Sequence, residues 1–236
     1  ANRRTTWTYD RLYTGQTVRG EMTESARYDN GNVYKWQALS ISTRYTVAGE
    51  HYIVPASETG LAGTYIYSYN QSLYTGAVTG MTYPAGGGLV TEAVTTKHDS
   101  TSGLPVTLDT NLSTVGSYVA AQGYSAFGEP TITTLKTAGG VYTQESVAYE
   151  HDTRRVHEVK VKPETSTGTV SSRVYDWEKN GNLLSIADAP EIGTADTQCF
   201  GYDTLQRLTS AWTPKSGVNC QTAPSTANLG GAAPYW

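Results

Sequence analysis

The residue types that could do chemistry are present in this 236-residue chain, but their spacing builds no catalytic motif. Ser125 lies between Gly123 and Gly128 in a pattern like the nucleophile elbow of hydrolases, which places a reactive serine on a sharp strand-to-helix turn. One residue too many separates Ser125 from Gly128, and no helical pattern follows. A turn between two strands explains the same residues, so we predict that the chain is not an enzyme.

The spacing of the histidines and carboxylates likewise indicates neither a metal site nor a catalytic site. The spacing of metal ligands is not found among the four histidines, His51, His98, His151 and His157. Hydrolysis of a glycosidic bond requires two carboxylates about 5 to 10 Å apart, and 21 acidic residues offer many such pairs by chance. We therefore expect no catalytic residue, no metal and no cofactor.

The two cysteines, Cys199 and Cys220, are separated by 21 positions. A disulfide between them would close a loop at the end of the chain and stabilise it by about 3 kcal/mol on a chain-entropy argument. Two unpaired thiols are the alternative. A zinc knuckle is excluded, because there is neither a Cys-x-x-Cys pair nor a nearby pair of histidines.

Charge and hydropathy exclude two classes of partner. The net charge is −4 and the isoelectric point is about 5.6, with Lys and Arg scattered along the chain. Nucleic-acid binding depends on clustered basic residues, so we expect no nucleic-acid partner. We also expect no membrane span, because no secretory signal, transmembrane segment or lipidation motif is visible.

The strongest pattern is a repeat of aromatic and acidic residues. Tyr-Asp occurs at Tyr9–Asp10, Tyr28–Asp29, Tyr175–Asp176 and Tyr202–Asp203, and degenerate copies occur at His98–Asp99, Tyr124–Ser125, Tyr149–Glu150 and, more loosely, Tyr69–Asn70. The period of about 26 fits one β-hairpin per unit, with two short strands and two connections. Since Asp at the start of a turn caps backbone amides, we expect its role to be architectural, with the tyrosines packing.

Composition and alternation favour strands throughout. The chain has 18 Tyr, 24 Gly and only 16% charged residues, which suits pleated strands joined by turns. Apolar and polar residues alternate over 39–47 and over 157–162, which predicts half-wetted antiparallel strands. The segment 89–97 is the best helix candidate, yet it is short and rich in Thr and Val, so we predict a strand. Turns are predicted at Asn30–Gly31, at Asn180–Gly181 and around 138–140.

These residues resemble the Rhs or YD-repeat family, whose units run Tyr-Asp, two or three residues, Gly, a polar residue, Leu and a short strand. The resemblance is closest at 175–186, where Gly181 takes the glycine position, and at 202–212, and it covers about 9–212. It implies an all-β fold, namely a repetitive antiparallel β-hairpin array that forms an open curved sheet or partial barrel. In such proteins, and in the related insecticidal toxin-complex and teneurin shells, the hairpin strip forms a hollow β-shell.

The resemblance also implies a function. We expect residues 1–236 to be a single array of about eight hairpins. The absence of an initial Met at Ala1 and the aromatic Tyr235–Trp236 indicate a fragment of a longer protein. That protein would be a secreted or surface-associated bacterial shell enclosing a C-terminal effector, so its partners would be the rest of the shell and the effector. The chain has no Asp-Pro dipeptide of the kind that family shells carry in their autoproteolytic segment.

A carbohydrate-binding or adhesion module is the alternative hypothesis. Tyr65, Tyr67 and Tyr69 alternate on one strand face and could form a platform that stacks against the sugar rings of a cell-surface glycan. The competing interpretation is that they line the packed face of the sheet and direct their hydroxyls to its rim.

Overall fold

The computed structural model describes residues 4–137 and 139–231, and every regular element within them is a β-strand. The chain divides into two compact units, Ala1–Gly116 and Ser117–Trp236. The expectations for Ala1, for the turn residue Ala138 and for Tyr235–Trp236 fall outside the described residues. The described part contains no helix with the length and hydropathy of a membrane span.

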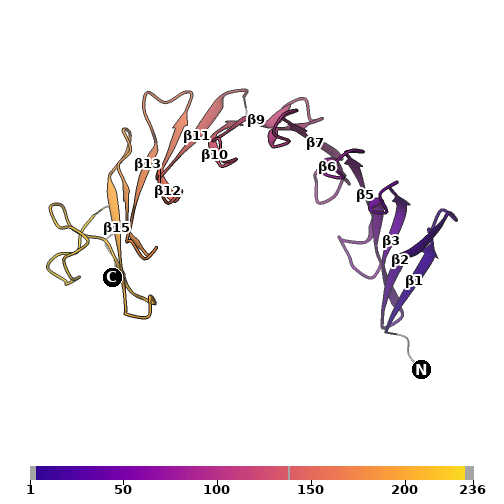
Figure 1. Cartoon of the computed structure of the whole chain (residues 1–236). Helices are drawn as coiled ribbons and strands as arrows, with labels where there is room; N and C mark the ends of the chain where they lie inside the picture. The colour runs from indigo at the N-terminus through magenta and orange to yellow at the C-terminus, as the bar shows by residue number, and fades with distance from the viewer. Residues whose placement is uncertain (1–3, 138, 232–236) are drawn as a thin grey trace. The chain divides into compact units, whose positions relative to one another are not determined.

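The first unit is an antiparallel meander in which each strand pairs with the next along the chain (Figure 1). Its strands are β1 (Thr5–Arg11), β2 (Thr17–Asp29), β3 (Asn32–Ile41), β4 (Val47–Val54), β5 (Gly63–Gln71), β6 (Val78–Tyr83), β7 (Glu92–His98) and β8 (Pro105–Thr110). Within the described residues of this unit, β1 and β8 do not pair with each other, so its sheet is open.

The second unit repeats this arrangement. Its strands are β9 (Ser117–Tyr124), β10 (Pro130–Lys136), β11 (Tyr142–Tyr149), β12 (Val156–Pro163), β13 (Ser171–Trp177), β14 (Leu183–Asp188), β15 (Asp196–Tyr202) and β16 (Leu208–Trp212). Here too the first and last strands are unpaired with each other among the described residues. The prediction of an all-β array of antiparallel hairpins is confirmed.

The strand expected over 39–47 is wrong, because the chain turns back inside it. β3 ends at Ile41 and β4 begins at Val47. The Ser42 hydroxyl accepts hydrogen bonds from the backbone amides of Arg44 and Thr46, at 3.2 and 3.3 Å, and Tyr45 adopts a left-handed φ of 58°. A local side-chain cap therefore overrides the alternating pattern. The strands expected near 89–97 and 157–162 are present as β7 and β12.

A one-layer sheet buries little, so the core is small. In the first unit Leu12, Val18 and Ala38 are buried, and the half-buried Trp36 packs against them. In the second unit Trp212 and Cys199 are buried and face each other across the β15–β16 pair. Most of the stability must therefore come from cross-strand pairs and from contacts between neighbouring hairpins.

A disulfide joins Cys199 of β15 to Cys220 in the segment after β16. The Cα atoms of the two residues are 5.1 Å apart. This segment also forms an isolated bridge between Pro214 and Leu229, next to the buried Trp212 and Thr213. The disulfide and the bridge hold the segment that follows the last hairpin.

Candidate functional site

Each hairpin is closed by the same kind of turn. The first residue of the turn donates its backbone amide to a carbonyl four or five residues further on, at 2.8 to 3.0 Å. The eight donor and acceptor pairs are Leu12–Gln16, Ser42–Thr46, Ser72–Ala77, Asp99–Leu104, Ser125–Glu129, Glu150–Arg155, Glu178–Asn182 and Asp203–Arg207. These eight hairpin turns begin 25 to 30 residues apart, and one further turn of the same kind, from Thr137 to Val141, lies between β10 and β11.

The residue before the acceptor carbonyl has a left-handed backbone in all eight turns. Five of these residues are glycines, namely Gly15, Gly76, Gly103, Gly128 and Gly181, with φ from 72° to 101°. The other three are Tyr45, Arg154 and Gln206, with φ from 58° to 60°. Glycine reaches this region without a steric penalty, which explains why glycine follows the aromatic–acidic pair in the repeat.

The first residue of several turns also caps the turn with its side chain. Oδ1 of Asp203 accepts the backbone amides of Leu205 and Arg207, both at 2.9 Å. Asp99 accepts those of Thr101 and Ser102, at 3.1 and 2.8 Å. Hydrogen bonds from the backbone amide of Arg207 and from its side chain lower the pKa of Asp203 below its ordinary value. The aspartate therefore has a structural role, and it stabilises the turn in its ionised form.

Serine takes the same position in three other turns, at Ser42, Ser72 and Ser125. The Ser125 hydroxyl accepts the amides of Phe127 and Glu129, at 3.1 and 3.4 Å, and donates to the Glu129 carboxylate at 2.5 Å. The elbow-like sequence around Ser125 is thus a capped turn. Within the described residues, no group of three or more His, Cys, Asp or Glu side chains is arranged to hold a metal ion.

The four Tyr-Asp copies do not occupy equivalent positions. Tyr202–Asp203 lies at the turn start, whereas Tyr175–Asp176 lies two residues too early and the equivalent pair is Trp177–Glu178. Gly181 is nevertheless the left-handed residue of that turn.

Tyr9–Asp10 is also two residues early, since its turn begins at Leu12. Asp10 instead accepts the amide of Gly20 at 2.7 Å, across the β1–β2 hairpin. Tyr28–Asp29 ends β2 and leads through Asn30–Gly31 into β3, so it lies at the connection between two hairpins. Tyrosine–acid pairs recur along these strands, but their position relative to the hairpin turn varies. Only the hydrogen bond that closes each turn shows where a repeat unit begins.

Arginines connect the turns of neighbouring hairpins. The Arg44 guanidinium donates to the Leu73 carbonyl, at 2.6 and 3.1 Å from its two nitrogens, and to the Tyr74 carbonyl at 2.5 Å. In the second unit, Arg155 donates to the Glu178 carbonyl at 2.9 Å, and its guanidinium lies 5.8 Å from the centre of the Trp177 ring. A planar cation with several donors suits this connection between turns.

Arg154 makes the corresponding contact with the preceding turn. Its Nε donates to Glu129 Oε1 at 3.0 Å, and its Nη2 pairs with the other carboxylate oxygen. The guanidinium also lies 4.5 Å from the centre of the Phe127 ring. The hydrogen bond from Arg154 is the main cause that lowers the pKa of Glu129 below its ordinary value.

Tyr65, Tyr67 and Tyr69 lie on one face of β5, and each is half-buried, whereas Ile66, Ser68 and Asn70 on the other face are exposed. The Tyr65 hydroxyl donates to the Leu61 carbonyl at 2.8 Å, and that of Tyr69 donates to Glu50 at 2.6 Å. The ring of Tyr67 makes edge contacts with those of Tyr52 and Tyr83. The three residues thus share a face, as the alternation indicates, and two of the three hydroxyls are bonded, one to the connection that precedes β5 and one to strand β4.

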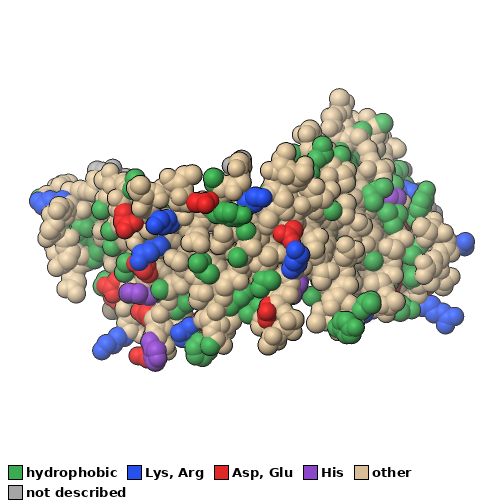
Figure 2. All heavy atoms as spheres, turned by 90° about the horizontal axis from the view of Figure 1, so that it is seen from above, with side chains coloured by type: hydrophobic (Ala, Val, Ile, Leu, Met, Phe, Trp, Pro, Cys, Tyr) green, Lys and Arg blue, Asp and Glu red, His purple; other side chains and the backbone are tan. Residues whose placement is uncertain are grey.

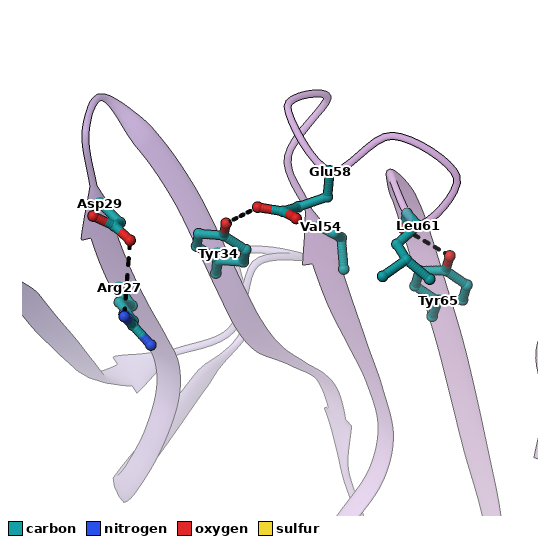
Figure 3. Close-up of a pocket in the computed structure, with 7 residues that line it drawn as sticks. All are labelled: Arg27, Asp29, Tyr34, Val54, Glu58, Leu61 and Tyr65. Carbon is teal, nitrogen blue, oxygen red and sulfur yellow. Dashed lines mark hydrogen bonds and ion pairs between the residues drawn. The ribbon is translucent and has the colours of Figure 1, made fainter.

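A hollow of about 450 Å³ lies at one end of this face (Figure 3). It is lined by Arg27, Asp29, Tyr34, Val54, Glu58, Leu61 and Tyr65. The Tyr34 hydroxyl donates to Glu58, and this hydrogen bond is the main cause that raises the pKa of Tyr34. Of the three tyrosines of the expected platform, only Tyr65 lines the hollow.

Charged side chains form no single-sign patch on the face seen in Figure 2, where acidic and basic groups lie close together in small sets. Ion pairs such as Lys97–Asp109, at 2.8 Å, place opposite charges side by side in the structure. The observed distribution agrees with the scattered charge in the sequence.

The architecture resembles that of known toxin complexes, although no family model and no curated protein matches the chain. A TcdB2–TccC3 complex superposes with a TM-score of 0.64 and 16% sequence identity over 89% of this chain. The chain has the fold of a part of these toxin-complex chains. The same complex without its hypervariable C-terminal region gives 0.64 over 94% of this chain, and the Photorhabdus luminescens Tc holotoxin pore gives 0.63 over 89%, each at 16% identity.

The resemblance stated from the sequence is confirmed at the level of the fold, which is a repetitive array of antiparallel β-hairpins. The chain spans about 12% of the length of each of these toxin-complex chains.

Proposed function

We propose that this chain is a segment of the wall of a YD-repeat shell and does no chemistry of its own. The observation that carries this proposal is the recurrence of one turn geometry in eight successive hairpins, each with a left-handed residue before the acceptor carbonyl. In an array of this kind each hairpin pairs only with its neighbours, so further hairpins can be added at either end to build a longer wall. The likeness in fold to toxin-complex chains supports the same role.

The rest of the proposal concerns the protein that carries this chain. We infer a secreted or surface-associated bacterial shell protein whose further hairpins complete the wall around an enclosed effector. A closed strip reduces the hazard of unpaired strand edges and separates its interior from solvent. The small share of the toxin-complex length that this chain spans is in keeping with a segment of such a wall.

Protease protection tests this proposal on the full-length protein. An enclosed effector should resist a protease that cleaves exposed chain, and should become sensitive when residues 117–163 are replaced by a Gly-Ser linker. The matched control is Gln144→Ser, which shortens an exposed side chain of β11 in the same region without removing strands. Equal sensitivity of the intact and interrupted proteins would rule out an enclosing wall.

A second candidate function is carbohydrate binding, and the hollow in Figure 3 is the observation that favours it. The rings of Tyr34 and Tyr65, with Val54 and Leu61, offer an apolar surface for a sugar ring, and Glu58 offers acceptor oxygens for its hydroxyls. Retention on a glycan array should be lost with Leu61→Glu and kept with Leu73→Glu. Both leucines are exposed, but Leu73 lies at a turn away from the hollow. A blank array for the unmodified chain would reject this candidate.

A further inference from the structure

One face of the first unit combines aromatic rings with carboxylates. Strand register places Trp36, Glu50, Tyr52, Tyr65, Tyr67, Tyr69, Tyr83 and Glu92 on this face, which we call the tyrosine face. Paired residues of an antiparallel sheet point to the same side, and residues two apart along a strand do so as well. The tyrosine face therefore runs without interruption from β3 to β7.

Four of these residues form a row across four neighbouring strands. Glu50 of β4 lies opposite Tyr67 of β5, and Tyr83 of β6 lies opposite Glu92 of β7. The ring centres of Tyr67 and Tyr83 are 6.3 Å apart in an edge contact, which joins the two halves of the row. Two carboxylates thus lie at the ends of the row, with two rings between them.

The carboxylate of Glu50 is surrounded by the aromatic side chains of Trp36, Tyr52 and Tyr69. Trp36 Nε1 donates to one carboxylate oxygen and the Tyr69 hydroxyl to the other, both at 2.6 Å. Burial, followed by the negative charge of Glu50, raises the pKa of the neighbouring Tyr52. Both donors are neutral, so the charge of Glu50 is hydrogen-bonded but not neutralised by these partners.

The basic residues of the same strands point to the other face. Lys35 of β3 lies opposite Ile53 and is 3.7 Å from Glu24, and Lys97 of β7 pairs with Asp109 at 2.8 Å. Arg44 lies in a turn, where it donates to two carbonyls. Within the described residues of β3 to β8, the tyrosine face carries acidic side chains but no lysine or arginine.

The rings of this face are accessible. Tyr52 is 44% exposed and Tyr83 is 42% exposed. The ring of Tyr67 lies between them, and its centre is 5.8 Å from the centre of the Tyr52 ring. The negative face of an aromatic ring attracts ammonium and guanidinium groups, and a nearby carboxylate adds to this attraction. The alkyl stem of a lysine or arginine can lie along the rings while its charged end reaches the carboxylate.

We propose that the tyrosine face binds the basic side chains of an extended polypeptide segment, with Glu50 as the main anchor and Glu92 as the second. The occupant is a basic segment because this face of β3 to β8 offers negative charge and ring faces, and its described residues include no lysine or arginine with which to bind an acidic one. Three strand spacings separate the two glutamates, about 14 Å, so an extended segment would present its basic residues about four positions apart. This inference does not depend on the shell function.

Binding is tested with the 236-residue chain and three synthetic peptides, in which lysine, norleucine or glutamate recurs every fourth residue among Gly and Ser. The readout is the NMR signal of the Trp36 indole N–H, which reports on Glu50 directly. We expect the lysine peptide alone to shift this signal, and 0.5 M salt to weaken its binding because exposed charges are then screened. Equal shifts with the norleucine or glutamate peptide would overturn the proposal.

Two pairs of variants locate the site. Glu50→Gln should weaken binding of the lysine peptide by about threefold or more, on the scale of a cation–aromatic and carboxylate contact. Glu145→Gln makes the same change of charge on an exposed strand position of the second unit and should have a smaller effect. Tyr52→Leu should weaken binding, whereas Tyr74→Leu, at a turn and 92% exposed, should not. Identical affinities within either pair of folded variants would reject the proposal.

Discussion

The residue before the acceptor carbonyl carries the backbone geometry of every hairpin turn. Five turns have glycine there, while Tyr45, Arg154 and Gln206 adopt the same left-handed backbone with a side chain attached. Such a backbone costs a residue with a side chain about 1–2 kcal/mol. Arg154 has compensating contacts with Glu129 and Phe127, and Gln206 is the simplest position at which to measure this cost.

Gln206→Gly should therefore stabilise the chain. Part of the relieved strain is offset because glycine gains freedom in the unfolded state, so we expect an increase of about 0.5–1 kcal/mol in the free energy of unfolding. Urea unfolding measures this quantity. The control is Gln198→Gly, on strand β15, which should destabilise the chain by a similar amount because its backbone needs no glycine. Loss of stability in both variants would contradict the account of the turn.

Asp203→Asn should lower stability at neutral pH, and this loss should shrink in acid. The hydrogen bonds of Asp203 lower its pKa in the folded state below the ordinary 3.8. A lowered carboxylate pKa stabilises the fold above the unfolded-state value, and that contribution is lost as the pH falls through the folded-state pKa. Thermal melts at pH 7 and below pH 3 compare the stability of Asp203→Asn with that of the unmodified chain.

Asp176→Asn is the matched control, since Asp176 belongs to a Tyr-Asp pair but lies within β13 and caps no turn. It should change stability less than Asp203→Asn at pH 7. If the two variants lost the same stability at pH 7, the assignment of the turn position would be wrong.

The repeat, its period and the β-fold could be predicted from the sequence, because recurring Tyr and Gly and the alternation of apolar and polar residues are local patterns of residue type. The phase does not, because Tyr175–Asp176 and Trp177–Glu178 both read as an aromatic–acidic pair. Only the hydrogen bond from Glu178 to Asn182 selects the second pair. The turn at 42–46 was missed because Ser42 and Tyr45 replace the Asp and Gly that mark other turns.

At the scale of elements, hairpins are joined by contacts from one turn to the next as well as by strand pairing. Arg44, Arg154 and Arg155 each contact an adjacent turn. These contacts connect residues far apart in sequence, so they could not be deduced from spacing. They join the turns at 42–46 and 72–77 in the first unit, and the turns at 125–129, 150–155 and 178–182 in the second.

Arg155→Ala should lower the free energy of unfolding by about 1–2 kcal/mol, because a hydrogen bond from a charged group to the Glu178 carbonyl is lost. Arg155→Lys should recover only part of this, since an ammonium lacks the planar arrangement of donors. Arg19→Ala removes an exposed arginine of β2 and should change stability by no more than about 0.5 kcal/mol. Equal effects of Arg155→Ala and Arg19→Ala in chemical denaturation would show that the contact between turns contributes nothing.

The disulfide acts on the segment that follows the last hairpin. Cys220→Ser should lower the free energy of unfolding by about 3 kcal/mol, because a loop of this length is no longer closed in the unfolded state. Hydrogen exchange should show the loss in β15 and β16 and not in the first unit. Addition of a reductant to the unmodified chain should reproduce the effect, and an unchanged melting temperature under both treatments would contradict it.

At the scale of the whole molecule, the chain is an array of hairpins, and its described residues contain no group of three or more His, Cys, Asp or Glu side chains arranged to hold a metal ion. Its features divide between those that build the array and those that a surface can use. The turns, caps and arginine contacts build it, while the tyrosine face and the hollow beside it remain open to partners. Function is therefore expected from the surfaces that many hairpins form together.

An electron cryo-microscopy structure of the full-length protein that carries this chain would show whether these hairpins form an enclosing wall. We expect the hairpins of residues 4–231 to continue into further hairpins with the same turn, and together to form a wall around an internal cavity that holds another part of the protein. A structure in which these hairpins form a separate appendage, with solvent on both sheet faces and no enclosed cavity, would contradict it.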